Sequence, residues 1–444
     1  MSLPNSWVMT PLSNLLDRIV GGGTPSKSIA ANFIGKVPFM TVKDMKARFI
    51  ADTVDHISED ALSSSATTKI PADTLVVATR MSLGKIVRPS SEVAINQDLK
   101  ALFPFAGVNK TYIEYFWRSK SDFIQSIGTG TTVKGIRIED IKNLEVPLAP
   151  ETEQRRIADK LDTTLARVDA LNDRLARITP LLKRFRQSVL AAAVTGKLSD
   201  KNEIPWNFEK LKKISKRVSV GHVGVTSKYY CDKEEGIPFL RSQNIRPGRM
   251  DFSGIVYITN EFHRSLKKSQ IIAGDLLVVR VGANRGDSCI VPKDFDGELN
   301  CANIVFARPL PEFVKSRYLE IYFQSPQCQE ILLGASVGGA QGVINTSVVG
   351  NIDVPLPSLQ EQAEIVRRVE ALFAFADRLQ ARLQSAQTAA ERLTPALLAK
   401  AFRGELVPQD PHDEPATELL RRLREARAAE ARIKPKRGRK AAAT

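Results

Sequence analysis

Hydrogen-bonding and basic side chains gather in the loop-like segments of the first 150 residues. The candidates are Thr24, Ser26, Lys27, Lys43, Arg80, Lys85, Thr131 and Lys134. Hydroxyl, ammonium and guanidinium groups of this kind bind phosphate oxygens and the edges of nucleic-acid bases. Gly21, Gly22 and Gly23, in the run "GGGTPSK" (21–27), would let the backbone approach a phosphate closely. The alternative for this run is a tight turn that binds nothing.

A second set of such side chains lies between residues 201 and 358. Its members are Ser227, Lys228, Arg241, Gln243, Asn244, Arg280, Asn284, Arg285 and Gln341. The run "RSQN" (241–244) places four of these residue types in one loop and is the strongest single candidate. Arg80 and Arg280 each end a strand-like run, where a structural ion pair is the alternative. Tyr229 and Tyr230 would stack on a bound backbone or pack in the core, and we favour the core.

The sequence offers no catalytic constellation beside these binding groups. It contains no Pro-Pro pair, which excludes the D/N/S-P-P-Y/F motif of amino-methyltransferases. Three Gly-Lys pairs, at 35–36, 84–85 and 196–197, are followed by Val, Ile and Leu, so none is a phosphate-binding loop. No nucleophile lies in a pattern with a base. We therefore expect a binding protein without catalytic residues of its own; a hidden enzyme is the least favoured alternative.

Cysteine usage and hydropathy indicate a cytoplasmic protein without a metal site. Cys231, Cys289, Cys301 and Cys328 all lie in the second half and form no C-x-x-C pair. Free thiols in a reducing compartment are favoured over a disulfide or a metal site. No apolar run approaches the ~20 residues of a membrane span, and the first residues lack a signal-peptide pattern.

The element that must position both sets of candidates is a long helix that occurs twice. Apolar residues recur at steps of three and four from about residue 151 to 197, and again from 359 to 405 at a constant offset of 208. The second copy reads Ile365, Val369, Leu372, Ala376, Leu379, Leu383, Ala386, Ala390, Leu393 and Leu397. Such spacing is typical of a coiled-coil seam. Pro180 and Pro395 predict a kink or a short break in these helices.

The segments around the helices repeat as well, so the chain is a tandem duplication. "LEVPLAPETEQRRI" (144–157) matches "IDVPLPSLQEQAEI" (352–365), and "VPFMTVKDM" (37–45) matches "IPFLRSQNI" (237–245). We expect an α+β fold with α/β domains at 1–150 and 201–358 and long helices at 151–200 and 359–406. Residues 407–444 would form a linker, a short helix and a basic disordered tail.

Chain connectivity favours antiparallel packing of the two helices. A helix of ~43 residues is ~64 Å long, whereas a domain of ~150 residues has a radius of gyration of only ~15 Å. The second domain cannot easily bridge the far ends that parallel packing would require. Antiparallel packing needs no bridge, and it relates the two domains by a pseudo-two-fold axis.

The formal net charge of +15 is concentrated near the C-terminus. Residues 421–440 carry ten basic and two acidic side chains, so the rest of the chain is only mildly basic. This permits nucleic-acid binding through local patches. The tail itself fits a non-specific electrostatic tether or plain disorder. Arg155, Arg156, Arg367 and Arg368 would face partners, DNA or solvent.

The repeated order of these motifs resembles the specificity subunit of Type I restriction–modification systems. "GGTPS" in the first domain, and "VPLAPETEQ" and "VPLPSLQEQ" before the two helices, carry the resemblance over residues 5–406. It implies two target-recognition domains, each reading one half of a split double-stranded DNA target. The second domain departs from the pattern because it lacks the "GGTPS" loop.

The resemblance also implies the partners and their cofactors. Two adenine-methyltransferase subunits, and with them the restriction subunits, would dock on the helical pair. S-adenosylmethionine, ATP and Mg would belong to those subunits, and none to this chain. The alternatives are a DNA-binding protein that acts without methyltransferase partners, and a coiled-coil scaffold whose ends bind carbohydrate or protein.

Overall fold

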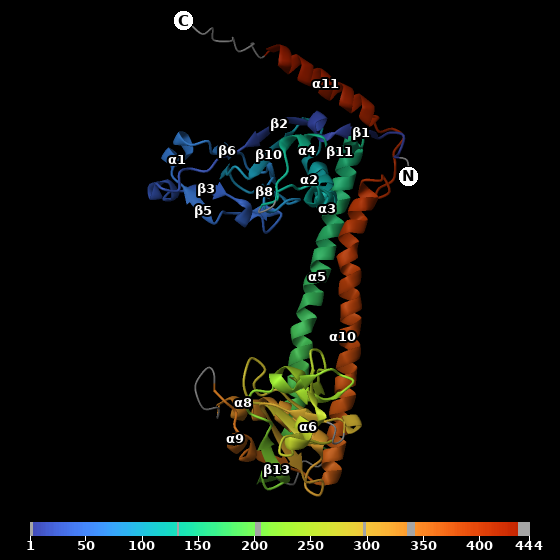
Figure 1. Ribbon diagram of the computed structural model, residues 1–444. Helices are drawn as coiled ribbons and strands as arrows, with labels where there is room; N and C mark the ends of the chain where they lie inside the picture. The colour runs from blue at the N-terminus through green and yellow to red at the C-terminus, as the bar shows by residue number, and fades with distance from the viewer. Residues whose placement is uncertain (1–2, 131–132, 200–205, 296–298, 335–341, 434–444) are drawn as a thin grey trace. The chain divides into compact units, whose positions relative to one another are not determined.

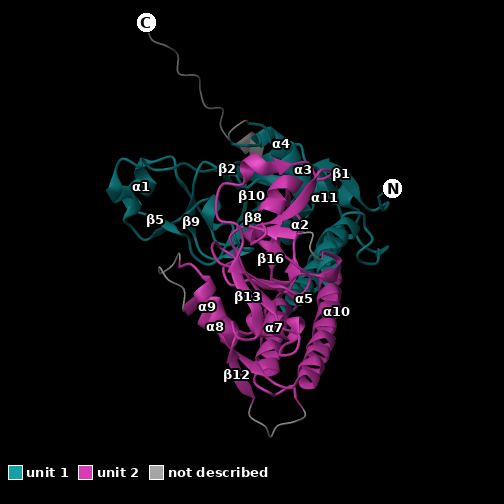
Figure 2. Ribbon diagram, turned by 60° about the horizontal axis from the view of Figure 1, so that its bottom comes forward, with its two compact units in different colours: residues 1–174, 386–444 teal, residues 175–385 magenta. Residues whose placement is uncertain are grey.

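The computed structural model describes residues 3–130, 133–199, 206–295, 299–334 and 342–433. The chain forms two compact units, unit 1 (1–174 and 386–444) and unit 2 (175–385), which Figure 2 distinguishes by colour. Each unit contains one α/β domain and part of both long helices, α5 (Glu151–Val194) and α10 (Leu359–Ala401), labelled in Figure 1. None of the helices among the described residues has the length and hydropathy needed to span a membrane.

The domain of unit 1 is built from short strands with a few helices. Its strands are β1 (Val8–Pro11), β2 (Leu16–Gly21), β3 (Val37–Met40), β4 (Phe49–Ile50), β5 (Asp55–Ile57), β6 (Thr68–Ile70), β7 (Leu75–Ala78), β8 (Ile86–Pro89), β9 (Val93–Ile95), β10 (Leu99–Pro104) and β11 (Glu145–Leu148). Its helices are η1 (Leu12–Leu15), η2 (Ala30–Phe33), η3 (Val42–Asp44), α1 (Glu59–Ser64), α2 (Lys110–Ser119), α3 (Ser121–Ser126) and α4 (Ile138–Lys142).

The domain of unit 2 uses the same kinds of element. Its strands are β12 (Asn207–Lys210), β13 (Ser215–Val220), β14 (Tyr230–Cys231), β15 (Gly236–Leu240), β16 (Ile245–Arg246), β17 (Arg249–Met250), β18 (Val256–Thr259), β19 (Gln270–Ile271), β20 (Leu276–Val279), β21 (Ser288–Ile290), β22 (Leu299–Cys301), β23 (Ile304–Pro309) and β24 (Asp353–Leu356). Its helices are η4 (Ser227–Tyr229), η5 (Ser242–Asn244), α6 (Asn260–Ser265), η6 (Lys293–Phe295), α7 (Ser316–Gln324), α8 (Pro326–Gly334) and α9 (Thr346–Gly350).

The strand order confirms that the two domains are copies of one fold. One sheet runs β2-β10-β7-β8-β4 in unit 1, and its counterpart runs β13-β23-β20-β21 in unit 2. The other runs β5-β3-β9-β6 and, within a five-stranded sheet, β18-β15-β22-β19. β7 and β20 are wholly buried apolar runs, as expected for strands covered on both faces. The duplication read from sequence therefore extends to sheet topology.

The two long helices pack against each other in opposite directions. In unit 2, Val189 near the end of α5 shares a core with Ile365 near the start of α10. Earlier on α5, Leu182 packs in a cluster with Ala376 and Leu383, further along α10. Contacts that lie earlier on α5 therefore lie later on α10, so the two helices are antiparallel. Unit 1 repeats the relation, because Leu165 of α5 shares its core with Leu398 of α10.

Two expectations about these helices need correction. Pro180 and Pro395 do not interrupt them, since α5 and α10 are each continuous through the proline. The predicted seam also drifts, because Leu171 and Leu393 are 41% and 40% exposed. A helix of 3.6 residues per turn rotates away from a 3.5-residue repeat unless it supercoils. The buried positions move to Leu398 and Ala401 near the end of α10.

The segment that follows α10 is packed rather than a free linker. The side chain of Asp413 is 7% exposed and pairs with Arg156 of α5 at 2.5 Å. Further on, α11 (Ala416–Ile433) buries Leu419, Leu420 and Leu423 in the core of unit 1. α11 lies against η1, and the backbone N–H of Ala416 donates to Ser6 O at 2.9 Å. The basic tail after residue 433 lies outside the described residues.

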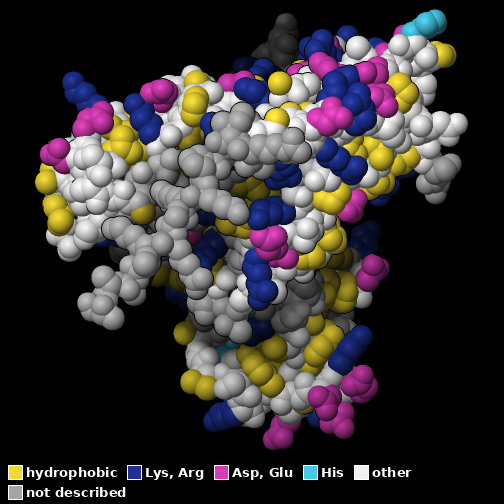
Figure 3. Space-filling view, turned by 90° about the horizontal axis from the view of Figure 1, so that it is seen from above, with side chains coloured by type: hydrophobic (Ala, Val, Ile, Leu, Met, Phe, Trp, Pro, Cys, Tyr) yellow, Lys and Arg dark blue, Asp and Glu magenta, His cyan; other side chains and the backbone are white. Residues whose placement is uncertain are grey.

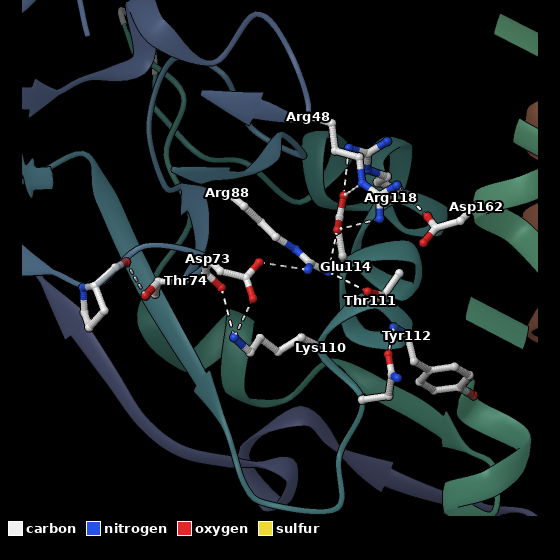
Figure 4. Close-up of polar contacts among 12 residues, drawn as sticks. Arg48, Asp73, Thr74, Arg88, Lys110, Thr111, Tyr112, Glu114, Arg118 and Asp162 are labelled. Atoms are coloured by element: carbon white, nitrogen blue, oxygen red, sulfur yellow. Dashed lines mark hydrogen bonds and ion pairs between the residues drawn. The ribbon is translucent and has the colours of Figure 1, made fainter. Parts of the chain in front are cut away.

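A buried glutamate fixes the domain of unit 1 to its long helix. Figure 4 shows Glu114 of α2 among Arg48, Arg88 and Arg118. Its carboxylate has no exposed area, and lies 2.7 Å from Arg48, 2.7 Å from Arg88 and 2.9 Å from Arg118. Arg48 also reaches Asp162 of α5 at 2.5 Å. Such a network resists the loss of any member, because one unpaired buried charge is costly.

Unit 2 builds the same attachment from other residues. Glu320 of α7 is 2% exposed, pairs with Arg317 and accepts from the backbone N–H of Ile290 at 3.0 Å. Arg317 reaches Glu370 of α10 at 3.1 Å. Burial raises the pKa of the Glu320 carboxyl even though Arg317 opposes that shift. Glu370 and Asp162 are separated by the same offset of 208 residues as the two helices.

Candidate nucleic-acid interface

In unit 1, three loops meet where two parallel strands end. β3 and β9 run side by side, with Met40 opposite Ile95. The loops that follow them, 41–44 and 96–98, therefore leave the sheet at the same edge. The glycine-rich loop joins them there, because the hydroxyl of Thr24 donates to the side chain of Gln97. Side chains from distant parts of the sequence thus share one surface.

The glycines of that loop are required by the protein's own backbone. A Cβ on Gly22 would lie 1.9 Å from Ile95 O, and a Cβ on Gly23 would lie 2.7 Å from the carbonyl carbon of Ala66. Both distances are impossible for a real side chain. Gly21 differs, since its Cβ would meet only the flexible end of Lys100 at 3.2 Å. Close packing therefore explains Gly22 and Gly23 without a bound phosphate.

Arg80 and Lys134 adjoin the same surface. Arg80 pairs in a β-bridge with Gly135, and the N–H of Met81 donates to Lys134 O at 3.2 Å. The Arg80 guanidinium is 63% exposed and lies 3.9 Å from Asp98, in the turn that carries Gln97. So exposed an ion pair contributes little and leaves the guanidinium available. Thr131 lies outside the described residues.

The other candidates of unit 1 are more scattered. Lys43 is 67% exposed and lies 3.5 Å from Asp55. Ser26 and Lys27 are exposed, and the Ser26 hydroxyl lies 2.8 Å from that of Ser28. Lys85 donates to Met45 O at 3.1 Å and lines a separate cleft beside the long helices. It does not share the surface of Gln97.

Unit 2 repeats the meeting of loops although its sequence lacks "GGTPS". β15 and β22 are parallel, with Leu240 opposite Cys301. A Cβ on Gly221 would lie 2.4 Å from Cys301 O, so Gly221 occupies the place of Gly22. The absence of "GGTPS" in unit 2 therefore changes the side chains of the loop but keeps the close contact between its backbone and the end of the parallel strand.

The "RSQN" loop contains two different kinds of residue. Asn244 is wholly buried; its Oδ1 accepts from Arg241 N at 3.0 Å and its Nδ2 donates to Asp251 O at 2.8 Å. Asp44 holds the counterpart loop in the same way, by accepting from Thr41 N at 2.7 Å. The prediction that Asn244 contacts bases does not fit this geometry. Asn244 shapes the loop instead.

Arg241 and Gln243 lie together at the surface. Arg241 Nη2 donates to Gly254 O at 2.8 Å, and Gln243 Nε2 lies 3.3 Å from the same oxygen. They line a cleft of about 410 Å³ together with Ser242, Asn284 and Asn303. This reading cleft presents amide, hydroxyl and guanidinium groups, the chemistry that distinguishes base edges.

Sequence reasoning missed Gln97 and Asn303. Each follows a parallel strand by two residues, after Ile95 in β9 and after Cys301 in β22. Asn303 adopts φ 53°, a left-handed conformation that asparagine tolerates better than most residues. The only sequence signal was a polar residue just past a short strand, which is too common to stand out.

The remaining candidates of unit 2 have mixed roles. Arg285 donates to Gly342 O at 2.6 Å, which ties two loops together. Nε of Arg280 is buried without a hydrogen-bond partner among the described residues. Ser227 and Lys228 are exposed, and Lys228 Nζ lies 4.9 Å from the Tyr229 ring centroid. Gln341 lies outside the described residues.

Tyr229 and Tyr230 differ in their surroundings. The rings of Tyr229 and Phe262 stack at 3.7 Å, consistent with a core position, whereas Tyr230 is 36% exposed.

The four outward helix arginines have partners within the chain. Arg155 pairs with Glu151 at 2.6 Å, and Arg367 and Arg368 both pair with Glu364 at 2.6 Å. In Figure 3, Lys and Arg side chains are scattered among Asp and Glu side chains over the face in view. Among the described residues, no three His, Cys, Asp or Glu side chains group as a metal site would require.

Comparison with known proteins agrees with this geometry. The family model described as "Type I restriction modification DNA specificity domain" matches residues 4–179 and 206–386. The chain belongs to this family.

Curated relatives include the Type I restriction enzyme EcoBI specificity subunit of Escherichia coli, 36% identical over 344 residues, which are 71% of this chain and 72% of that protein. The EcoKI specificity subunit of Escherichia coli K12 is 29% identical over 96% of this chain and 97% of its own length. The HsdS subunit from Thermoanaerobacter tengcongensis shares the fold, with a TM-score of 0.59 at 18% identity over 91% of this chain and 99% of that chain.

Proposed function

We propose that this chain is a non-catalytic DNA-recognition subunit whose two domains each read one half of a bipartite, asymmetric double-stranded target. One observation carries the proposal: the same fold holds different side chains at the same place. Thr41-Val42-Lys43 of unit 1 corresponds to Arg241-Ser242-Gln243 of unit 2. A buried side chain holds each loop by accepting a backbone hydrogen bond, Asp44 in unit 1 and Asn244 in unit 2. Equivalent positions with unlike hydrogen-bonding groups select unlike bases.

The long helices would carry the partners. Apolar side chains remain exposed on them, including Leu181 at 52% and Phe375 at 48%. A bound partner protein would remove these apolar side chains from water. We infer that two adenine-methyltransferase subunits dock here, with restriction subunits joining them. S-adenosylmethionine, ATP and Mg would be bound by those subunits in the cytoplasm, and this chain would supply the target.

Mapping methylated adenines tests the proposal. A host strain lacking other adenine methylation would carry this chain with its proposed methyltransferase partner, and its genome would be sequenced for modified bases. We expect one recurring motif made of two unlike blocks separated by bases of any identity. A matched strain without this chain should lack the motif. A continuous or palindromic motif, or one that persists without the chain, would contradict the proposal.

A further inference from the structure

A cluster of three basic side chains in unit 2 has no role in the reading cleft. Arg264, Lys267 and Lys268, here called the basic ledge, lie on α6 and on the turn that leads into β19. All three are exposed. With His222 and Ser265 they line a pocket of about 520 Å³. The ledge is therefore a hollowed surface as well as a charged one.

The charges of the basic ledge are not neutralised within the described part of the chain. None of the three side chains there forms a salt bridge with an acidic residue, whereas many other arginines of the chain do. The one side-chain hydrogen bond found for them joins Arg264 Nε to Asn260 O at 3.3 Å. Adjacent like charges repel one another, so a site of this kind favours an anion.

The basic ledge adjoins the reading cleft through a shared loop. His222 lines the ledge pocket, while Gly224 and Thr226, a few residues later, line the cleft. The same loop contacts Asn303, whose backbone N–H donates to His222 O at 3.2 Å. A duplex whose base edges faced the cleft would therefore bring its phosphates near the ledge.

Unit 1 has no such ledge at the equivalent place. β19 pairs with β22 as β6 pairs with β9, and this register aligns Ile271 with Ile70 at an offset of 201. The same offset places Ser63, Ala66 and Thr67 where unit 2 has its three basic residues. Moreover, α1 has Glu59 where α6 has Asn260, while the next residue is acidic in both helices, Asp60 and Glu261. The charge belongs to one copy of the fold only.

We propose that the basic ledge binds backbone phosphates of duplex DNA beside the half-site read by unit 2, which makes unit 2 the electrostatic anchor of the complex. This inference rests on the proposed function. Phosphate contacts release condensed counterions, so each one steepens the dependence of affinity on salt by about 0.9 in a double-logarithmic plot. They carry no sequence information of their own.

The test replaces the basic ledge with its counterparts from unit 1, as Arg264→Ser, Lys267→Ala and Lys268→Thr in the full chain. Fluorescence anisotropy would follow binding to labelled duplexes, with and without the mapped target, from 50 to 200 mM salt. We expect the salt slope to fall by about 2 to 3 on both duplexes. For a loss of three contacts, the variant's affinity would then decline about 40-fold less than that of the wild type over this range.

The matched control removes three exposed lysines of unit 2 outside the ledge, as Lys233→Ala, Lys293→Ala and Lys315→Ala, and should leave the slope within about one of the wild-type value. An equal fall in the control would overturn the inference, because net charge alone would then explain it. A wild-type slope in the ledge variant, or a loss confined to the target duplex, would also overturn it. If the wild-type chain showed no salt-dependent binding, the proposed function itself would fail.

Discussion

At the scale of residues, the structure separates buried side chains that hold the loops from exposed side chains beside them. Asp44 and Asn244 are buried and hold their loops through backbone hydrogen bonds. Lys43 and Gln243, one residue earlier, are exposed. A buried residue that holds the loop, preceded by an exposed residue that differs between the units, lets the same backbone present different hydrogen-bonding groups.

The close contact at Gly22 gives a prediction about folding. Gly22→Ala and Gly221→Ala each drive a Cβ into a carbonyl oxygen, at 1.9 and 2.4 Å. We expect each change to lower the free energy of unfolding by at least about 1–3 kcal/mol, because the neighbouring backbone must move. Thermal and urea unfolding would measure the loss.

Gly21→Ala is the matched control, since the nearest atoms to its new methyl group would be those at the end of the Lys100 side chain, at 3.2 Å and beyond, and no backbone atom. It should unfold like the wild type. If Gly22→Ala kept full stability and lost only DNA affinity, close approach to a phosphate, and not internal packing, would be the reason for the glycine.

Sequence alone identified part of the proposed interface and not the rest, and burial and strand pairing explain the difference. Arg241, Gln243 and Asn284 were predicted and do line the reading cleft. Asn244 belongs to the same polar run, but its inward orientation depends on contact with Asp251. Gln97 and Asn303 become visible only once the parallel pairing of β3 with β9 and of β15 with β22 is known.

At the scale of elements, periodicity predicted the long helices within a few residues of their ends. Of the kink or short break expected at each proline, the break is wrong, since α5 and α10 each continue through the proline. The packing of residues 407–415 against unit 1 was not predictable from their Pro-rich composition, because it depends on contacts with residues distant in the sequence. Gln409 donates to Glu153, which also accepts from Trp7 Nε1 at 2.9 Å.

The docking of this segment depends on the ion pair of Asp413 with Arg156. A hydrogen bond from Arg156 lowers the pKa of the Asp413 carboxyl below its ordinary value of 3.8. The pair therefore stabilises docking above that pH and ceases to do so as pH falls through the lowered pKa. Asp413→Asn should weaken docking by about 1 kcal/mol, since Arg156 is 36% exposed and partly screened.

Hydrogen exchange of the α11 backbone measures this effect. At neutral pH, about 1 kcal/mol corresponds to roughly fivefold faster exchange through local opening. Asp410→Asn, a change at an exposed neighbour whose side chain hydrogen-bonds only with His412 among the described residues, should leave exchange unchanged. Equal acceleration in both variants would show that the ion pair does not hold the helix.

At the scale of the whole molecule, we propose that one chain contains two independent DNA readers. Unit 1 and unit 2 share the order of their strands, a glycine packed against the end of a parallel strand, and ion pairs that join the domain to a long helix. They differ in the side chains at their loop surfaces. Duplication supplied the common frame, which is why sequence repeats predicted the architecture well. We propose that the identity of the bases depends on the loops, where the two copies differ in sequence.

The most direct test maps methylated adenines in cells that carry single-residue variants of either unit. Gln243→Ala and Asn303→Gly alter the reading cleft of unit 2, and glycine suits the φ of 53° at position 303. Gln97→Ala alters the matching surface of unit 1. Loss of a specific base contact costs about 1–3 kcal/mol of discrimination, or roughly 5- to 150-fold. The account predicts that the two unit 2 variants relax one half of the target, that Gln97→Ala relaxes the other, and that the untouched half stays intact each time. A variant that relaxed both halves equally would contradict it.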